Sequence, residues 1–134
     1  MIALDTNILA RLLLGDDAAQ LARAKALLSE ARQFTAPITV MLELVWVLEA
    51  NDVEPAALAN GLERLLNLRN FKPAHVAEIR QALSGYREGL DFADALHLAL
   101  SASATQMVSF DKTFSKRAKK LGLEPSVEEP PVRS

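Results

Sequence analysis

Residues 37–50 read PITVMLELVWVLEA, and no other stretch constrains the fold as strongly. Between Ile38 and Leu48 only Thr39 and Glu43 carry polar side chains, which predicts a helix that is buried over most of its surface. A glutamate is rarely buried unless a cation, a proton or an exposed niche compensates its charge. No cap, turn or solvated face in the sequence accounts for Glu43. We therefore interpret Glu43 as a functional carboxylate.

On both sides of this helix, short apolar runs alternate with longer segments of helical periodicity. This alternation is typical of an α/β fold around a mostly parallel sheet. Strands are expected at residues 2–5, 34–36, 71–72, 107–110 and 125–127. Further helices are expected at about residues 8–14, 17–32, 55–65, 76–89, 91–103 and 112–121. The length of 134 residues and the apolar content of 50% fit one globular domain with a single core.

Composition excludes several classes of site. Cysteine is absent, so disulfides, thiolate zinc sites and cysteine nucleophiles are excluded, and any metal site must use oxygen ligands or the two histidines. Met1 leads directly into Ile2-Ala3-Leu4, and no apolar stretch approaches the roughly 18 to 20 residues that span a bilayer. We therefore expect a soluble, cytoplasmic protein with no membrane association.

The formal net charge of −2 conceals a basic segment near the end of the chain. Its members are Lys112, Lys116, Arg117, Lys119 and Lys120. This segment is suited to contact RNA phosphates, or it is simply the solvated face of a helix. With one Trp and one Tyr, the chain has few side chains on which bases can stack. Phosphate contacts, metal and RNA shape are therefore expected to dominate RNA binding.

Further carboxylates follow predicted strands or begin predicted helices. Asp5 ends the first strand, Asp111 follows a later one, and Asp91 and Asp94 begin the helix that precedes that later strand. Because ligands bind outside the carboxyl ends of strands in open α/β sheets, Asp5 and Asp111 lie where a site is expected, and Glu43 can point to the same edge. Helix capping is the alternative for Asp5, Asp91 and Asp111. An N-cap at Asp91 leaves Asp94 less well explained.

Several acids at one sheet edge repel each other unless cations are bound. Mg²⁺ and Mn²⁺ prefer carboxylate and water oxygens and leave coordination positions free for substrate phosphates. One or two such ions activate water and stabilise charge on a phosphodiester. The pattern therefore predicts phosphodiester hydrolysis.

Four motifs together resemble the PIN-domain ribonucleases, and more narrowly the VapC-like toxins of type II toxin–antitoxin systems. They are ALDTNIL at 3–9, LEL at 42–44, DFADALHLA at 91–99 and VSFDKTF at 108–114. The similarity runs from Met1 to about Leu123. It implies a three-layer α/β/α sandwich with a central, mostly parallel sheet in residues 1–123. Residues 124–134 are expected to form the last short strand and, because EEPPVRS is rich in proline and charge, a disordered tail.

The resemblance also implies a Mg²⁺-dependent or Mn²⁺-dependent endoribonuclease. Asp5 and Asp94 match its primary metal ligands, Glu43 matches an acid that holds the metal or its water, and Asp111 matches a fourth acid that acts directly or through water. The accessory acid and the polar positions that orient the quartet are matched by Asp91, Thr6, Asn7 and Ser109. The implied partners are an RNA substrate and a cognate small antitoxin. We expect a homodimer or a toxin–antitoxin hetero-oligomer.

Two other functions remain open from the sequence. A metal-dependent phosphatase or phosphotransferase would use Asp5 as its nucleophile, but the second Asp that is common two positions later is Asn7 here. A non-catalytic antitoxin partner that binds operator DNA is the other alternative. Four like charges brought together are not needed by a protein that only binds, so they favour catalysis.

Overall fold

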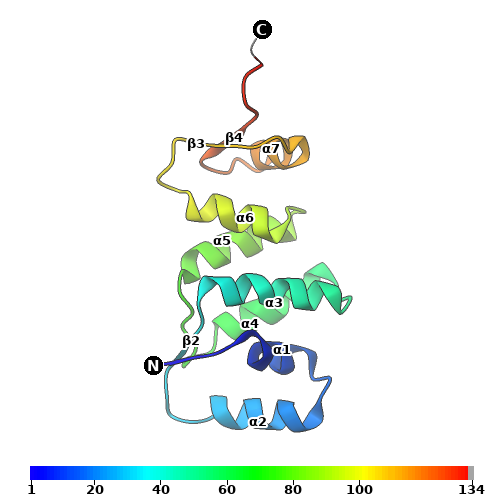
Figure 1. The fold of residues 1–134 in the computed structure, drawn as a ribbon, viewed down its shortest axis with the longest axis vertical. Coiled ribbons are helices and arrows are strands. Elements are labelled where there is room, and N and C mark those ends of the chain that lie inside the picture. The colour runs from blue at the N-terminus through cyan, green and yellow to red at the C-terminus, as the bar shows by residue number, and fades with distance from the viewer. Residues whose placement is uncertain (133–134) are drawn as a thin grey trace. The chain divides into compact units, whose positions relative to one another are not determined.

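The computed structural model describes residues 1–132, and helices and parallel strands alternate along it, which is an α/β arrangement (Figure 1). In chain order the elements are β1 (Ile2–Ala3), α1 (Thr6–Leu14), α2 (Ala18–Leu28), β2 (Phe34–Thr35), α3 (Ile38–Ala50), α4 (Pro55–Leu66), α5 (Val76–Arg87), α6 (Phe92–Leu100), β3 (Gln106–Val108), α7 (Lys112–Lys120) and β4 (Ser126–Glu128). The chain divides into two compact units, Met1–Val76 and the residues from Ala77 onward. Each unit contains one two-stranded parallel sheet.

The first unit is organised around β1, β2 and helices α1 to α4. Ile2 pairs with Phe34 and Ala3 with Thr35 in parallel register. Helix α1 packs against α2 and α3, and α3 packs against α4. Local sequence sets these helices: Gly15 ends α1 in the left-handed conformation, with φ of 61°, and the Asp17 carboxylate caps α2 by accepting a hydrogen bond from the Gln20 N–H at 3.0 Å. The buried core of this unit includes Leu9, Phe34, Met41, Leu44, Leu58, Leu62 and Phe71.

The second unit contains α5, apart from its first residue, together with α6, α7, β3 and β4. Met107 pairs with Val127 in parallel register, and α7 packs against β4. Gly85 permits a close approach within this unit, because a Cβ at this position would lie 3.0 Å from the Leu90 side chain and 3.4 Å from Ala95 Cβ. The core side chains of this unit include Ile79, Leu83, Phe92, Leu96, Phe114 and Val127.

Most predicted elements are present, with differences at their ends. Residues 71–72 form only an isolated bridge between Phe71 and Phe34, and Pro73, which follows, has no N–H with which to extend a ladder. Helix α2 ends at Leu28 instead of residue 32, where the Ser29 hydroxyl donates a hydrogen bond to the Ala26 carbonyl at 2.7 Å.

The sandwich and the boundary at residue 123 stay predictions. In residues 1–132, strands pair in two separate two-stranded parallel sheets, and one isolated parallel bridge joins Phe34 to Phe71. The α/β class is therefore observed, and the three-layer arrangement is not established by the pairing. The end of the predicted tail, residues 133–134, lies outside the described residues.

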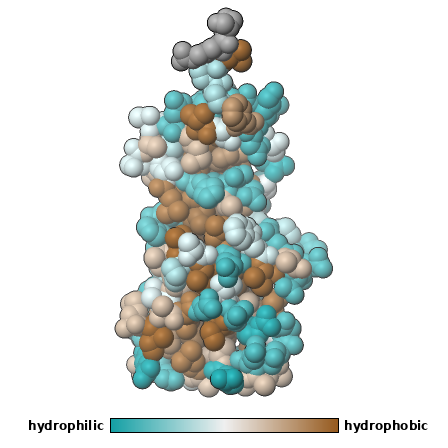
Figure 2. All heavy atoms as spheres, in the orientation of Figure 1, coloured by the Kyte–Doolittle hydropathy of each residue, from teal (hydrophilic) through white to brown (hydrophobic). Residues whose placement is uncertain are grey.

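Apolar side chains also reach the surface. Figure 2 shows hydrophobic residues between hydrophilic ones on the face that it presents. The exposed large apolar side chains include Trp46 and Phe110. Among residues 1–132, no helix combines the length and the apolar character needed to cross a membrane.

Candidate functional site

Three of the predicted site acids are helix N-caps. Asp5 accepts a hydrogen bond from the Thr6 N–H at 2.8 Å, Asp91 accepts one from the Asp94 N–H at 3.1 Å, and Asp111 accepts one from the Phe114 N–H at 3.0 Å. Each carboxylate therefore lies at the positive end of its helix, where negative charge is stabilised. The capping interpretation is confirmed for these residues. Each cap uses one carboxylate oxygen, so the other oxygen of the same carboxylate can still bind a metal ion.

Asp94 has a different environment, in the first turn of α6. Its side chain is half-buried, and no cap explains it. Burial raises the pKa of the Asp94 carboxyl above its usual value, the negative charges of Asp91 and Asp111 raise it further, and His97 opposes the shift. The structure thus brings three of the predicted acids into one electrostatic neighbourhood. Within the described part of the chain, however, no group of three or more acidic, His or Cys side chains is arranged to hold a metal ion.

Glu43 lies on an exposed stripe of α3, which corrects the expectation that this helix is buried around Glu43. Thr39, Glu43 and Trp46 are exposed, whereas the buried side of the helix is formed by Met41, Leu44, Val45 and Leu48. This stripe was not predicted from the sequence, because a Trp at position 46 is expected to be a core residue. A solvated face therefore accounts for the charge of Glu43 without a cation. Its functional role stays a prediction.

The polar residues predicted to orient the acids behave differently from one another. The Ser109 hydroxyl accepts a hydrogen bond from the Asp111 N–H at 3.0 Å, so Ser109 directly positions the backbone of Asp111. Asn7 is exposed. Thr6 is 3% exposed, and its hydroxyl oxygen is buried without a hydrogen-bond partner among the described residues. A buried hydroxyl without a partner is costly, and here it directly follows Asp5.

The basic segment occupies α7, and its members fall into two groups. The side chains of Lys112, Lys116, Lys119 and Lys120 are exposed. Arg117 instead donates a hydrogen bond to the Gly89 carbonyl, which ties α7 to the loop after α5. Arg117 therefore has a structural contact, whereas the four lysines have the solvent access that phosphate binding requires.

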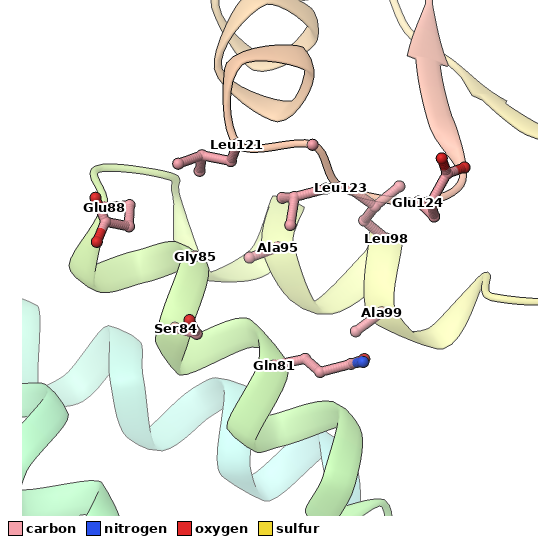
Figure 3. Close-up of a pocket in the computed structure, with 11 residues that line it drawn as sticks. Gln81, Ser84, Gly85, Glu88, Ala95, Leu98, Ala99, Leu121, Leu123 and Glu124 are labelled. Atoms are coloured by element: carbon pink, nitrogen blue, oxygen red, sulfur yellow. The ribbon is translucent and has the colours of Figure 1, made fainter.

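Two cavities are lined by residues other than the four acids of the predicted quartet, although Asn7, a predicted site residue, lines the second. One of about 390 Å³ in the second unit is lined by α5, by α6 and by the segment after α7, with Gln81 and Ser84 on one side and Leu121 and Leu123 on another (Figure 3). A second, of about 540 Å³, is lined by α1 and α2 in the first unit. Among the described residues that line these two cavities, none belongs to the predicted acidic quartet.

Sequence reasoning missed Phe110. This side chain is 86% exposed and lies between Ser109 and Asp111, two of the predicted site residues. The available signal was its position at the end of an apolar strand directly before a polar helix start. We had interpreted Phe110 as part of the strand at 107–110, whereas β3 ends at Val108.

Comparison with known proteins identifies the family. No curated protein matches the chain. The family model described as the PIN domain matches residues 2–120, which contain all four acids of the predicted quartet. PIN domains are generally nucleases that use divalent metal ions. The match covers most of the sequence, and the chain therefore belongs to the PIN domain family.

Proposed function

We propose that this protein is a metal-dependent endoribonuclease that uses Mg²⁺, with Mn²⁺ as a substitute. The observation that carries the proposal is Asp94, which is half-buried and shares its surroundings with Asp91 and Asp111 in a chain of the PIN domain family. Such an arrangement of like charges costs free energy in the absence of a cation. A divalent ion reverses this cost, because it favours the ionised form of every nearby carboxylate.

The donor chemistry fits a hard divalent cation. Asp5, Glu43, Asp94 and Asp111 offer only carboxylate oxygens, the ligands that Mg²⁺ and Mn²⁺ prefer. The buried Thr6 hydroxyl, which has no partner in residues 1–132, adds a donor beside Asp5 that is suited to orient a carboxylate or a water. Asp5 and Glu43 belong to one unit, and Asp94 and Asp111 belong to the other.

The proposed reaction assigns distinct tasks to these side chains. A bound divalent ion supplies Lewis acidity at the scissile phosphodiester. Asp94 acts in its ionised form, Ser109 holds Asp111 in place through the Asp111 N–H, and Glu43 orients the attacking water. Lys112 and Lys116 on α7 neutralise phosphates of the bound strand.

Cleavage of labelled single-stranded RNA tests this function. We expect the wild type to cut RNA internally with Mg²⁺ or Mn²⁺ and to lose activity in EDTA, and we expect Asp5→Asn to be inactive. Glu129→Gln, an exposed acid outside the quartet, is the matched control and should retain wild-type activity. Mapping RNA ends after induced expression of the wild type and Asp5→Asn would then identify the sites that are cut.

Three results would contradict the nuclease proposal. Cleavage that persists in EDTA or in Asp5→Asn would exclude the metal mechanism. Hydrolysis of a phosphomonoester without RNA cleavage would favour the phosphatase alternative. Binding of operator DNA without any cleavage would favour a non-catalytic antitoxin partner.

We further propose that the protein is the toxin of a VapC-like type II toxin–antitoxin pair. The cavity between α1 and α2 supports docking of an antitoxin segment, because it combines apolar Ile8, Ala24 and Leu27 with the cation Arg23. Arg11 also lines the cavity but is paired with Asp16 at 3.1 Å, and Glu30 adds one acid to the lining. Helix α4 does not contribute to the lining of this cavity in the described structure. An apolar segment with acidic side chains is complementary to it.

Growth assays test the toxin role. Expression of the wild type alone should arrest growth, Asp94→Asn should be harmless, and co-expression of the small protein encoded beside it should restore growth. Arg23→Glu should remain toxic but resist this rescue. If neither the wild type nor Asp94→Asn arrested growth, this result would contradict the toxin role. Light scattering of the purified protein, alone and with its partner, would distinguish a homodimer from a hetero-oligomer.

A further inference from the structure

Exposed aromatic side chains are rare in this protein. Four of the five Phe side chains and the single Tyr are buried, whereas Trp46 and Phe110 are exposed. Phe110, at 86% exposure, is the more exposed of the two, and it directly precedes the predicted site acid Asp111. A large apolar ring left in water next to a carboxylate contributes little to folding. Its position needs another explanation.

The backbone on both sides of Phe110 is fixed. Before it, the Ser109 N–H donates a hydrogen bond to the Glu128 carbonyl at 2.9 Å, which continues the pairing of β3 with β4. After it, Asp111 is held by the Ser109 hydroxyl and by its cap on α7, while buried Phe114 anchors the first turn of that helix. The ring of Phe110 therefore projects from a rigid turn, which lowers the entropy that binding would cost.

The charges around Phe110 indicate its partner. Lys112 and Lys116 follow within two turns on the same segment and are exposed. A rigid aromatic ring combined with neighbouring cations is the arrangement by which proteins hold single-stranded nucleic acid, because bases stack on the ring and phosphates meet the cations. A surface that binds an apolar protein partner is instead expected to be larger, more apolar and without neighbouring lysines.

We propose that Phe110 stacks on an unpaired RNA base next to the phosphodiester that is cut, and so positions the strand for cleavage. This inference rests on the proposed ribonuclease function and specifies its substrate as RNA that is unpaired at the cleavage site. Phe110 makes no bond in the reaction. It acts by placing one nucleotide, and an unpaired base is required because a base in a duplex already stacks on its neighbours.

Binding of single-stranded RNA with one abasic nucleotide, moved stepwise along the strand, tests the stacking. Affinity is measured in EDTA to prevent cleavage. Wild type should lose about tenfold in affinity at one or two positions, the range expected for one stacked base. Phe110→Ala should bind intact RNA about tenfold more weakly than wild type does. Removing the base at the sensitive positions should not weaken the binding of Phe110→Ala any further. Phe110→Trp should behave like wild type, and Phe110→Leu, which keeps apolar bulk without a ring, should behave like Phe110→Ala.

Salt dependence separates stacking from charge. Phe110→Ala should leave the slope of log affinity against log salt unchanged, whereas Lys116→Ala should reduce it by about 0.7. Since the ring is exposed, all Phe110 variants should melt at the wild-type temperature. In Mn²⁺, Phe110→Ala should cleave intact single-stranded RNA more slowly than wild type does. On an RNA that lacks the base at the sensitive position, the two proteins should cleave at the same rate.

Several outcomes would overturn the stacking proposal. Equal RNA affinity of wild type and Phe110→Ala, or full activity of Phe110→Leu, would exclude a stacked base. A change from dimer to monomer in Phe110→Ala with unchanged RNA affinity would identify a protein interface instead. If wild type cleaves RNA but the abasic scan shows no sensitive position, the inference fails while the ribonuclease function stands. If wild type neither binds nor cleaves RNA, both fail.

Discussion

Helices α3 and α6 are both strongly apolar, and each carries a carboxylate within its first two turns, yet the two acids have opposite environments. Glu43 on α3 projects from an exposed stripe that also contains Thr39 and Trp46. Asp94 on α6 is half-buried, with Asp91 and Asp111 close enough to raise its pKa. Glu43 is exposed to solvent. The charge of Asp94 is opposed by burial and by the charges of Asp91 and Asp111, whereas His97 favours it.

This difference shows that an acid in an apolar sequence is informative only when its surroundings oppose its charge. Glu43 is flanked by apolar residues in the sequence, but on the helix its side chain is exposed to solvent, which costs little free energy. Asp94 looks like part of a capping box, but its position inside the first turn leaves it among other acids. Perturbed carboxylates are concentrated at functional sites, so Asp94 on α6 is a stronger candidate for a functional acid than Glu43 on α3.

The largest expected difference between Asp94 and Glu43 is in the rate of RNA cleavage. We expect Asp94→Asn to reduce RNA cleavage by at least about 100-fold and Glu43→Gln by about tenfold, because removing a primary metal ligand costs several kcal/mol of transition-state stabilisation. Single-turnover cleavage rates at saturating Mn²⁺ measure both, with Glu129→Gln as the control. If Glu43→Gln were as inactive as Asp94→Asn, exposure would not distinguish the two acids. Wild-type rates in both variants would remove them from the mechanism.

Metal-induced stabilisation provides a second test of the same pair. Mn²⁺ at about 100 times its dissociation constant should stabilise the folded wild type by about 2.7 kcal/mol, a rise in Tm of about 8 °C. Asp94→Asn should lose most of this rise and Glu43→Gln only part of it, whereas Glu129→Gln should keep it. Thermal melts with EDTA and with Mn²⁺ measure these differences. Full Mn²⁺ stabilisation of Asp94→Asn would exclude Asp94 as a metal ligand.

Local signals in the sequence predicted the elements and their caps well. Asp17 and Pro55 act over a few residues, so their consequences for α2 and α4 can be predicted from the neighbouring residues in the sequence. The exposure of Trp46 and Phe110 was not predicted, because burial depends on which side of an element meets distant parts of the chain. The same reason explains Arg117, whose contact with Gly89 spans 28 positions in the sequence.

The helix caps allow a smaller test in the second unit. Asp111→Ala should destabilise the protein by about 1 kcal/mol, because the Phe114 N–H loses its acceptor, whereas Asp111→Asn should stay near wild type, since Asn also caps well. If Asp111 also contributes to catalysis, both variants should cleave RNA slowly. Denaturant unfolding and cleavage rates, measured on the same preparations, separate the two roles. An active Asp111→Asn would leave capping as the role of Asp111.

The smallest effect concerns the metal-free protein and follows from the sign of the Asp94 shift. A carboxyl group whose pKa is raised in the folded state binds its proton more tightly there than in the unfolded chain. The free energy of unfolding therefore falls as the pH rises from 3.8, the ordinary pKa of an aspartate, through the raised value, and the loss persists at neutral pH. Asn resembles the protonated form and escapes this loss.

Asp94→Asn should consequently be more stable than wild type in EDTA at pH 7, by less than about 1 kcal/mol, because solvent screens a half-exposed carboxylate. This corresponds to a rise in Tm of about 1 to 3 °C. The difference should shrink as the pH falls through about 4 and vanish below about pH 3, where Asp94 is protonated in both states. Glu43→Gln, on the exposed stripe of α3, should show no such gain at either pH. Equal melting temperatures of Asp94→Asn and wild type at pH 7 would mean that Asp91 and Asp111 do not strain Asp94, and the contrast between α3 and α6 would lose its electrostatic basis.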